Sequence, residues 1–191
     1  DFANEGKEKK QDQFYCLQPI IARSITDEEK LKSIFKDEYN DDIKEHGVWE
    51  IIDGQQRLTT IFLLYKYLMD QKGWDAETLK EEEDGKELYH ICYATRDGSA
   101  KFLEGMSMKM IKDNSEEDFK QNVDFFHMAN AFKYIAEWIR TDGKAINIRY
   151  QLGGSLDNIR NSFFKLLNGM SDTKGGSVQV LWYEIAESKE K

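Results

Sequence analysis

The chain has 191 residues, with 27 Lys and Arg against 36 Asp and Glu, and a formal net charge of −9. An acidic surface disfavours non-specific DNA binding, because contacts between basic residues and phosphates supply most of that affinity. Two cysteines are too few for a disulfide framework, and the longest apolar run is far shorter than the roughly 20 residues of a membrane-spanning helix. We therefore expect a cytoplasmic protein with no membrane partner.

The first predicted elements are a strand and a helix. Residues 14–22 are apolar enough for a strand, in which Pro19 favours an edge position or a strand end. Thr26 is a suitable cap for a helix over residues 27–39. The side chains expected to face inward from that helix are Leu31, Ile34 and Phe35.

A short strand and a long helix follow, joined by a tight turn. Val48, Ile51 and Ile52 predict a buried strand, and residues 53–54 form the turn. The helix is expected to end at Gly73. Its apolar residues recur at the three-and-four spacing of one helix face: Leu58, Ile61, Phe62, Tyr65, Leu68 and Met69.

The rest of the chain is predicted to be mainly helical. Residues 75–94 combine a short helix with a strand. Ser115 and Asp118 form an approximate capping box that opens a long helix reaching residues 142–143. A further helix is predicted to end at Gly169.

Together these elements predict one α+β domain over residues 1–191. Residues 14–98 are expected to form its α/β part, with a small sheet. Residues 99–191 are expected to form a mainly helical part that ends in a strand at residues 178–185.

The turn before the long helix concentrates polar side chains at a strand-to-helix junction. Taken singly, Asp53 is explained as a helix cap and Gly54 as a turn residue with positive φ. The first helical turn, however, carries Gln55, Gln56 and Arg57, where acidic residues would suit the helix dipole better. A helix N-terminus presents backbone N–H groups to anions. The combination predicts an anion site, with phosphate as the natural guest.

Residues 52–60, Ile-Asp-Gly-Gln-Gln-Arg-Leu-Thr-Thr, resemble the signature of the DGQQR family, the N-terminal domain of GmrSD-type restriction endonucleases. Weaker similarities lie at residues 14–22, 93–99 and 178–185. The resemblance implies a small mixed sheet of the ParB/sulfiredoxin type. In that family the domain binds and hydrolyses nucleoside triphosphates, while a nuclease domain on the same chain or a partner cuts foreign DNA.

The resemblance also implies roles for individual residues. Asp53 would orient Mg²⁺ or the attacking water, and Gly54 would let the backbone approach the phosphates. Gln55 and Gln56 would hydrogen-bond phosphate or water, and Arg57 would stabilise charge on the transferring group, so that Asp53, Gln56 and Arg57 are the expected catalytic residues. Further expected contacts are Thr59 and Thr60 as hydroxyl donors, and Arg96 and Ser99 as secondary site residues.

Family members usually begin with an Arg/aromatic segment that nothing before residue 14 matches, and they usually continue beyond the late strand. We therefore expect a fragment of a longer protein. The nuclease domain or subunit is expected to lie outside this chain, and the chain is expected to act on DNA through that partner. Formation of a homo-oligomer is an open alternative. Two alternatives to a nucleoside triphosphatase remain: a module that senses nucleotide or DNA without turnover, and a ParB-like nuclease, which the acidic balance disfavours.

Overall fold

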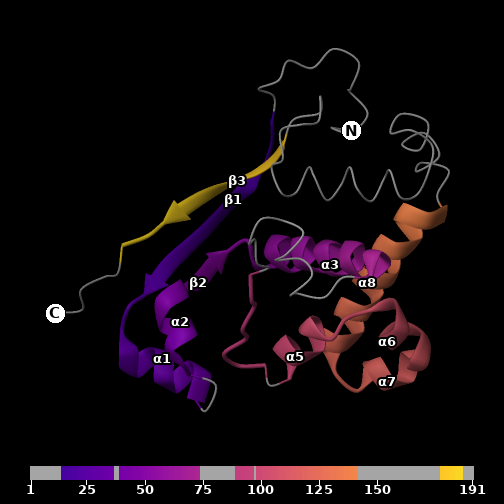
Figure 1. Ribbon diagram of the computed structural model, residues 1–191, viewed down its shortest axis with the longest axis horizontal. Coiled ribbons are helices and arrows are strands. Elements are labelled where there is room, and N and C mark those ends of the chain that lie inside the picture. The colour runs from indigo at the N-terminus through magenta and orange to yellow at the C-terminus, as the bar shows by residue number, and fades with distance from the viewer. Residues whose placement is uncertain (1–13, 37–38, 74–88, 97, 142–176, 187–191) are drawn as a thin grey trace. The chain divides into compact units, whose positions relative to one another are not determined.

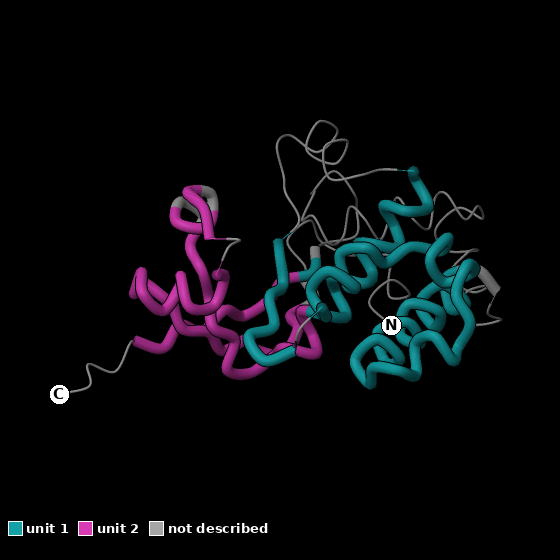
Figure 2. The backbone as a smooth tube through the Cα atoms, turned by 90° about the horizontal axis from the view of Figure 1, so that it is seen from below, with its two compact units in different colours: residues 1–15, 59–178 teal, residues 16–58, 179–191 magenta. Residues whose placement is uncertain are grey.

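The computed structural model of the protein describes residues 14–36, 39–73, 89–96, 98–141 and 177–186. The chain divides into two compact units, coloured separately in Figure 2. We call them the sheet unit, residues 16–58 and 179–191, and the helical unit, residues 1–15 and 59–178.

The sheet unit is built on a three-stranded sheet in the order β2-β1-β3. The central strand is β1 (Phe14–Ile25), and β2 (Val48–Asp53) pairs with it in an antiparallel register that joins Ile25 to Val48. The late strand, β3 (Ser177–Glu184), lies along the other side of β1 and runs in the same direction (Figure 1). The small mixed sheet and the late strand, together with the helices described below, confirm the predicted α+β class.

Pro19 lies inside the central strand, so the prediction that it marks an edge strand or a strand end was wrong. The paired residues of β1 and β2 begin at Ile21, which lies beyond the proline. The missing N–H of Pro19 therefore interrupts none of those pairs. The register shifts between Ile21 and Ala22, which marks a bulge next to the paired Asp53.

The first helix, α1, spans Glu28–Phe35 and begins one residue later than predicted. Its N-cap is Asp27 and not Thr26, because the carboxylate of Asp27 accepts a hydrogen bond from the backbone N–H of Lys30 at 3.0 Å. Thr and Asp are both favourable N-cap residues. Asp27 is the N-cap here because its side chain reaches the N–H of the third helical residue.

The helix predicted over residues 27–39 was too long, because α1 ends at Phe35. After α1 the backbone of Lys36 has a positive φ of 51°, which ends the helix. A second helix, α2 (Asp41–His46), follows with Asn40 as its N-cap. The sequence did not predict α2, because its residues are mostly polar and show no apolar period.

The predicted strand-turn-helix is confirmed by β2 and α3, which spans Gln55–Lys72 and is followed by Gly73. The predicted burial was partly wrong. Ile52 is 46% exposed, because consecutive side chains of a strand point to opposite faces of the sheet and Ile51 and Ile52 therefore lie on different faces. In α3 the side chains of Leu63 and Tyr67 are buried alongside the expected Phe62, Leu68 and Met69, whereas Leu58, Ile61 and Tyr65 are only partly buried.

The helical unit contains residues 59–72 of α3 together with α5 (Ser99–Glu104), α6 (Met108–Asp113), α7 (Glu116–Lys120) and α8 (Val123–Thr141). Its core joins α3 to the other helices through buried apolar side chains, among them Phe62, Leu68, Leu103, Phe119 and Phe132. The ring of Tyr67 meets that of Phe132 edge-on, with centroids 5.8 Å apart.

The capping box of Ser115 and Asp118 is confirmed, but it opens the short helix α7 and not the long one. The long helix starts separately at Val123, after Asn122. Residues 89–93 form no regular element, which corrects the strand predicted there. The helix predicted before Gly169 lies outside the described residues, as do residues 75–88. Among the described helices, none combines the length and apolar character needed to cross a membrane.

Candidate functional site

The junction between β2 and α3 consists of Gly54 alone, because β2 ends at Asp53 and α3 begins at Gln55. Gly54 is buried and has a φ of +97°, a conformation that other residues rarely adopt. A Cβ atom there would lie 2.9 Å from Cγ1 of Ile20 and 3.1 Å from Nη2 of Arg57. Both the backbone angle and the available space therefore require glycine at this turn.

Asp53 lies beside the turn with its side chain 65% exposed. Its Oδ1 accepts a hydrogen bond from the N–H of Gly54 at 2.8 Å, and its Oδ2 lies 3.3 Å from Nη2 of Arg57. These two contacts orient the carboxylate while solvent still reaches it. Each oxygen also keeps a lone pair for a water molecule or a cation.

Arg57 connects the first turn of α3 to the central strand. Its Nη1 donates to Oε1 of Gln18 at 2.8 Å, and its Nη2 donates to the carbonyl oxygen of Pro19 and to Asp53. The side chain is only 27% exposed, although it lies in the first turn of a helix. The reason lies in β1: the carbonyl of Pro19 and the amide of Gln18 both accept from the guanidinium.

The rest of the first turn of α3 is polar and uncharged. The side-chain amide of Gln55 donates to the carbonyl oxygen of Ile51 at 2.9 Å, which ties it back to β2. Gln56 is exposed, and the turn contains no acidic residue. A helix that begins without an acidic side chain keeps the positive end of its dipole for another anion.

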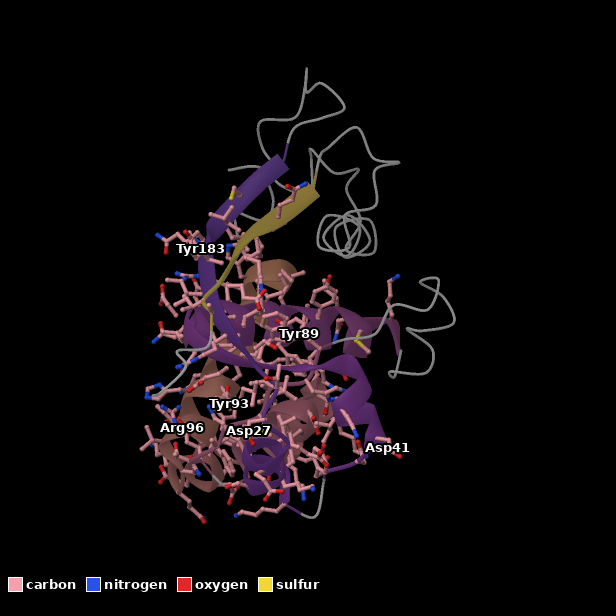
Figure 3. The ribbon with its side chains drawn as sticks, turned by 90° about the vertical axis from the view of Figure 1, so that its left-hand side faces the viewer. Asp27, Asp41, Tyr89, Tyr93, Arg96 and Tyr183 are labelled. Atoms are coloured by element: carbon pink, nitrogen blue, oxygen red, sulfur yellow. The ribbon has the colours of Figure 1, made fainter. Side chains whose placement is uncertain are left out.

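A second group of polar contacts lies in the helical unit. The hydroxyl groups of Thr59 and Tyr93 are 3.1 Å apart, so α3 is joined to the segment of residues 93–99. The guanidinium of Arg96 lies 5.9 Å from the centre of the Tyr93 ring. Figure 3 labels both side chains. Thr60, the other predicted hydroxyl donor, is exposed on α3.

Asp124, in the first turn of α8, joins the two secondary residues that the sequence indicated. Its Oδ1 accepts from Nη1 of Arg96 at 2.9 Å, and its Oδ2 accepts from the hydroxyl of Ser99 at 3.2 Å. Ser99 is fully buried, while Arg96 is 54% exposed. Sequence reasoning missed Asp124, because nothing in its local pattern relates it to a segment 25–28 residues away.

The described structure thus brings the predicted residues together in two sets. Asp53, Gly54 and Arg57 meet in the sheet unit, where Gln18 is the residue that the sequence did not indicate. Thr59 is joined through Tyr93 to the segment that carries the second set in the helical unit.

The described residues contain no group of three or more His, Cys, Asp or Glu side chains placed to hold a metal ion. Mg²⁺ in nucleotide sites commonly takes only one or two protein carboxylates, with phosphate oxygens and water completing its shell. The exposed carboxylate of Asp53 fits such a site, and it is the residue that would hold the ion.

Comparison with protein-family models matches residues 3–190 to the N-terminal domain of the GmrSD restriction endonuclease. Searches of curated proteins and of solved structures gave no match. The family match extends over almost the whole chain, including both sets of contacts. The chain therefore belongs to the family of GmrSD restriction endonuclease N-terminal domains, which connects it with a restriction system.

Proposed function

We propose that the chain binds and hydrolyses a nucleoside triphosphate and thereby controls the cleavage of foreign DNA, modified DNA included, by a nuclease outside this chain. The observation that carries the proposal is the junction at Gly54 in a chain of the GmrSD family. The turn at Gly54 leads from the strand directly into a helix whose first turn carries no acidic residue, and backbone N–H groups at such a helix N-terminus favour phosphate.

In this proposal Arg57 supplies positive charge to the phosphates. A guanidinium has five N–H donors, and the contacts to Gln18, Pro19 and Asp53 use three of them. Those contacts fix its plane before the ligand arrives, so less side-chain entropy is lost on binding. Gln55, Gln56, Thr59 and Thr60 add neutral donors.

Asp53 serves the reaction in this proposal. Its carboxylate orients the attacking water, and Gln56 hydrogen-bonds that water or the γ-phosphate. Attack on the γ-phosphorus breaks its bond to the bridging oxygen and releases inorganic phosphate and the nucleoside diphosphate. When bound at Asp53, Mg²⁺ would supply charge that offsets the phosphate oxygens.

A second candidate is a module that binds nucleotide or DNA as a signal without turnover. The contacts of Arg57 favour it, because a guanidinium already held by three acceptors has fewer donors left to stabilise a transition state. Phosphate release measured with and without DNA separates the two candidates. The state of the DNA in the same reaction tests whether the chain itself is a nuclease.

Replacement of Arg57 tests the binding site. We expect Arg57→Ala to weaken the binding of ATP and Mg²⁺, measured by isothermal titration, roughly ten- to a hundredfold, since a charge-assisted contact worth on the order of 1.5–3 kcal/mol is lost. Arg23→Ala is the matched control, because Arg23 is 32% exposed in the same unit and pairs with Glu50. Equal losses in the two variants would contradict the assignment.

Replacement of Asp53 tests the chemistry. Asp53→Asn keeps the shape of the side chain and removes its charge, so we expect phosphate release to fall about a hundredfold or more, with a smaller effect on nucleotide affinity. Thermal unfolding of each variant checks that it is folded. Unchanged turnover by Asp53→Asn would show that catalysis, if present, lies elsewhere.

A further inference from the structure

The guanidinium of Arg57 has one N–H group left for a ligand from solvent. Of its five donors, one on Nη1 is taken by Gln18, and two on Nη2 are taken by Pro19 and Asp53. The fourth, on Nε, is buried and has no hydrogen-bond partner among the described residues. A buried N–H is closed to an approaching ligand. The remaining donor is the second N–H of Nη1, so an anion must meet Arg57 at that nitrogen.

The side chain of Gln18, in β1, holds the same nitrogen. Its Oε1 accepts from Nη1 of Arg57 at 2.8 Å, and the residue is exposed. A guanidinium has no acceptor, so the amide must turn its oxygen toward Arg57, which leaves its NH₂ group for another acceptor. No described residue accepts a hydrogen bond from that NH₂ group. Two further donors therefore lie next to the one that Arg57 has left.

Charge favours this end of the guanidinium for an anion. The carboxylate of Asp53 contacts Nη2, whereas Nη1 contacts the neutral amide of Gln18. An anion at Nη1 thus approaches the cation on the side away from that carboxylate, where like-charge repulsion is weaker. Gln18, Asp53 and Arg57 all belong to the sheet unit, and the hydrogen bonds above join them directly.

We propose that Gln18 is a phosphate-binding residue, whose NH₂ group donates to the same phosphate group as the remaining N–H of Arg57. This rests on the proposed nucleotide binding and adds to it a residue of the central strand that the sequence did not indicate. Arg57 supplies the charge. Gln18 supplies a neutral donor whose orientation the guanidinium has already fixed, so less side-chain entropy is lost when the phosphate binds.

Replacement of Gln18 by methionine tests the proposal, because methionine keeps the length of the side chain and removes its donors. We expect Gln18→Met to weaken the binding of ATP and Mg²⁺, measured by isothermal titration, about three- to tenfold. The double variant with Arg57→Ala should be at least about twofold weaker than Arg57→Ala alone, since each side chain makes its own contact. Gln121→Met makes the same change at an exposed position of α7 and is the control, with unchanged binding expected.

The double variant separates a phosphate contact from an effect exerted through the arginine. If Gln18 only positions Arg57, Gln18→Met adds nothing once Arg57 has been replaced, and this result overturns the proposal. Unchanged binding by Gln18→Met, while Arg57→Ala still weakens it, also overturns the proposal and leaves the proposed function intact. No ATP binding by the unaltered chain overturns both.

A second variant keeps the test decisive if Gln18→Met does not fold. Gln18→Glu keeps an acceptor for Nη1 of Arg57, removes both N–H donors and adds a negative charge beside the proposed phosphate. We expect it to weaken ATP binding more than tenfold. Binding by a folded Gln18→Glu protein that equals binding by the unaltered chain would contradict a phosphate at this position.

Discussion

Gly54 and Arg57, at the turn between β2 and α3, contribute both to the fold and to the proposed nucleotide site. The side chain of Arg57 holds the first turn of α3 against Gln18 and Pro19, and Nη2 lies 3.1 Å from the position of a Cβ on Gly54. The glycine and the arginine are therefore packed against each other. Spacing along the sequence indicated both residues but not this mutual contact.

The first prediction at this scale concerns Gly54. Gly54→Ala imposes a positive φ on alanine and also places its Cβ 2.9 Å from Ile20, so we expect a loss of unfolding free energy of about 2 kcal/mol or more. Gly47→Ala is the control, since Gly47 has a similar φ of +76° and no atom within 4 Å of the added Cβ. Its φ and ψ of 76° and 152° lie in a region that is almost exclusive to glycine, so its loss of about 1–3 kcal/mol measures the cost of the backbone conformation alone. Urea unfolding of both variants measures the difference, and equal losses would show that the close packing contributes nothing.

At the scale of helices and strands, the sequence predicted the elements that are defined by neighbouring residues in the chain. The strand-turn-helix and its end at Gly73 follow from apolar periodicity and a glycine, both local features. The buried face of α3 was predicted less well, because the helices that cover Leu63 and Tyr67 lie elsewhere in the chain.

The same reasoning explains the residues of the candidate sites that were missed. Gln18 meets Arg57 across 39 residues, and Asp124 meets Arg96 across 28. Apolar periodicity and motifs within one segment carry no information about contacts between residues so far apart in the sequence. The residues that the sequence indicated are the ones that lie in a continuous motif, and their partners required the fold.

The capping box of α7 gives a prediction about pH. Hydrogen bonds from the hydroxyl and the N–H of Ser115 hold the pKa of Asp118 below its ordinary value of 3.8. A lowered carboxylate pKa stabilises the fold above that value, and this stabilisation is lost as the pH falls through the lower pKa of the folded state. We expect Ser115→Ala to lower the melting temperature at pH 7 and to lower it less near pH 3.

The matched control for that pH dependence is the cap of α6. Ser107 accepts from the N–H of Met110 at 3.1 Å, and its third helical residue is a methionine in place of a carboxylate. Ser107→Ala is expected to cost about 1 kcal/mol, with little change between the two pH values. The same pH dependence in both variants would show that the Asp118 carboxylate is not the titrating partner.

At the scale of the whole molecule, the two compact units differ in the cores that the described residues form. The helical unit buries a continuous cluster from α3, α5, α6, α7 and α8. The buried apolar side chains described in the sheet unit are few: Ile20, Ala22, Ile25 and Leu31. Strand pairing also stabilises the sheet unit. So does an aromatic contact between Trp49 of β2 and Trp182 of β3, the two strands that flank β1, whose ring centres are 5.3 Å apart.

Local opening follows the amount of buried apolar surface, so the two units should open at different free energies. We expect hydrogen exchange, followed by mass spectrometry, to be slower for the amides of α8 than for those of β1 and β2. Trp182→Ala removes an aromatic contact worth about 0.5–1.5 kcal/mol, and it should speed exchange in β1 and β2 roughly two- to tenfold while leaving α8 unchanged. Tyr183→Ala, at an exposed neighbouring position, is the control. Equal acceleration in α8 would show that the units open as one, and the sheet around the proposed nucleotide site would then have no independent motion.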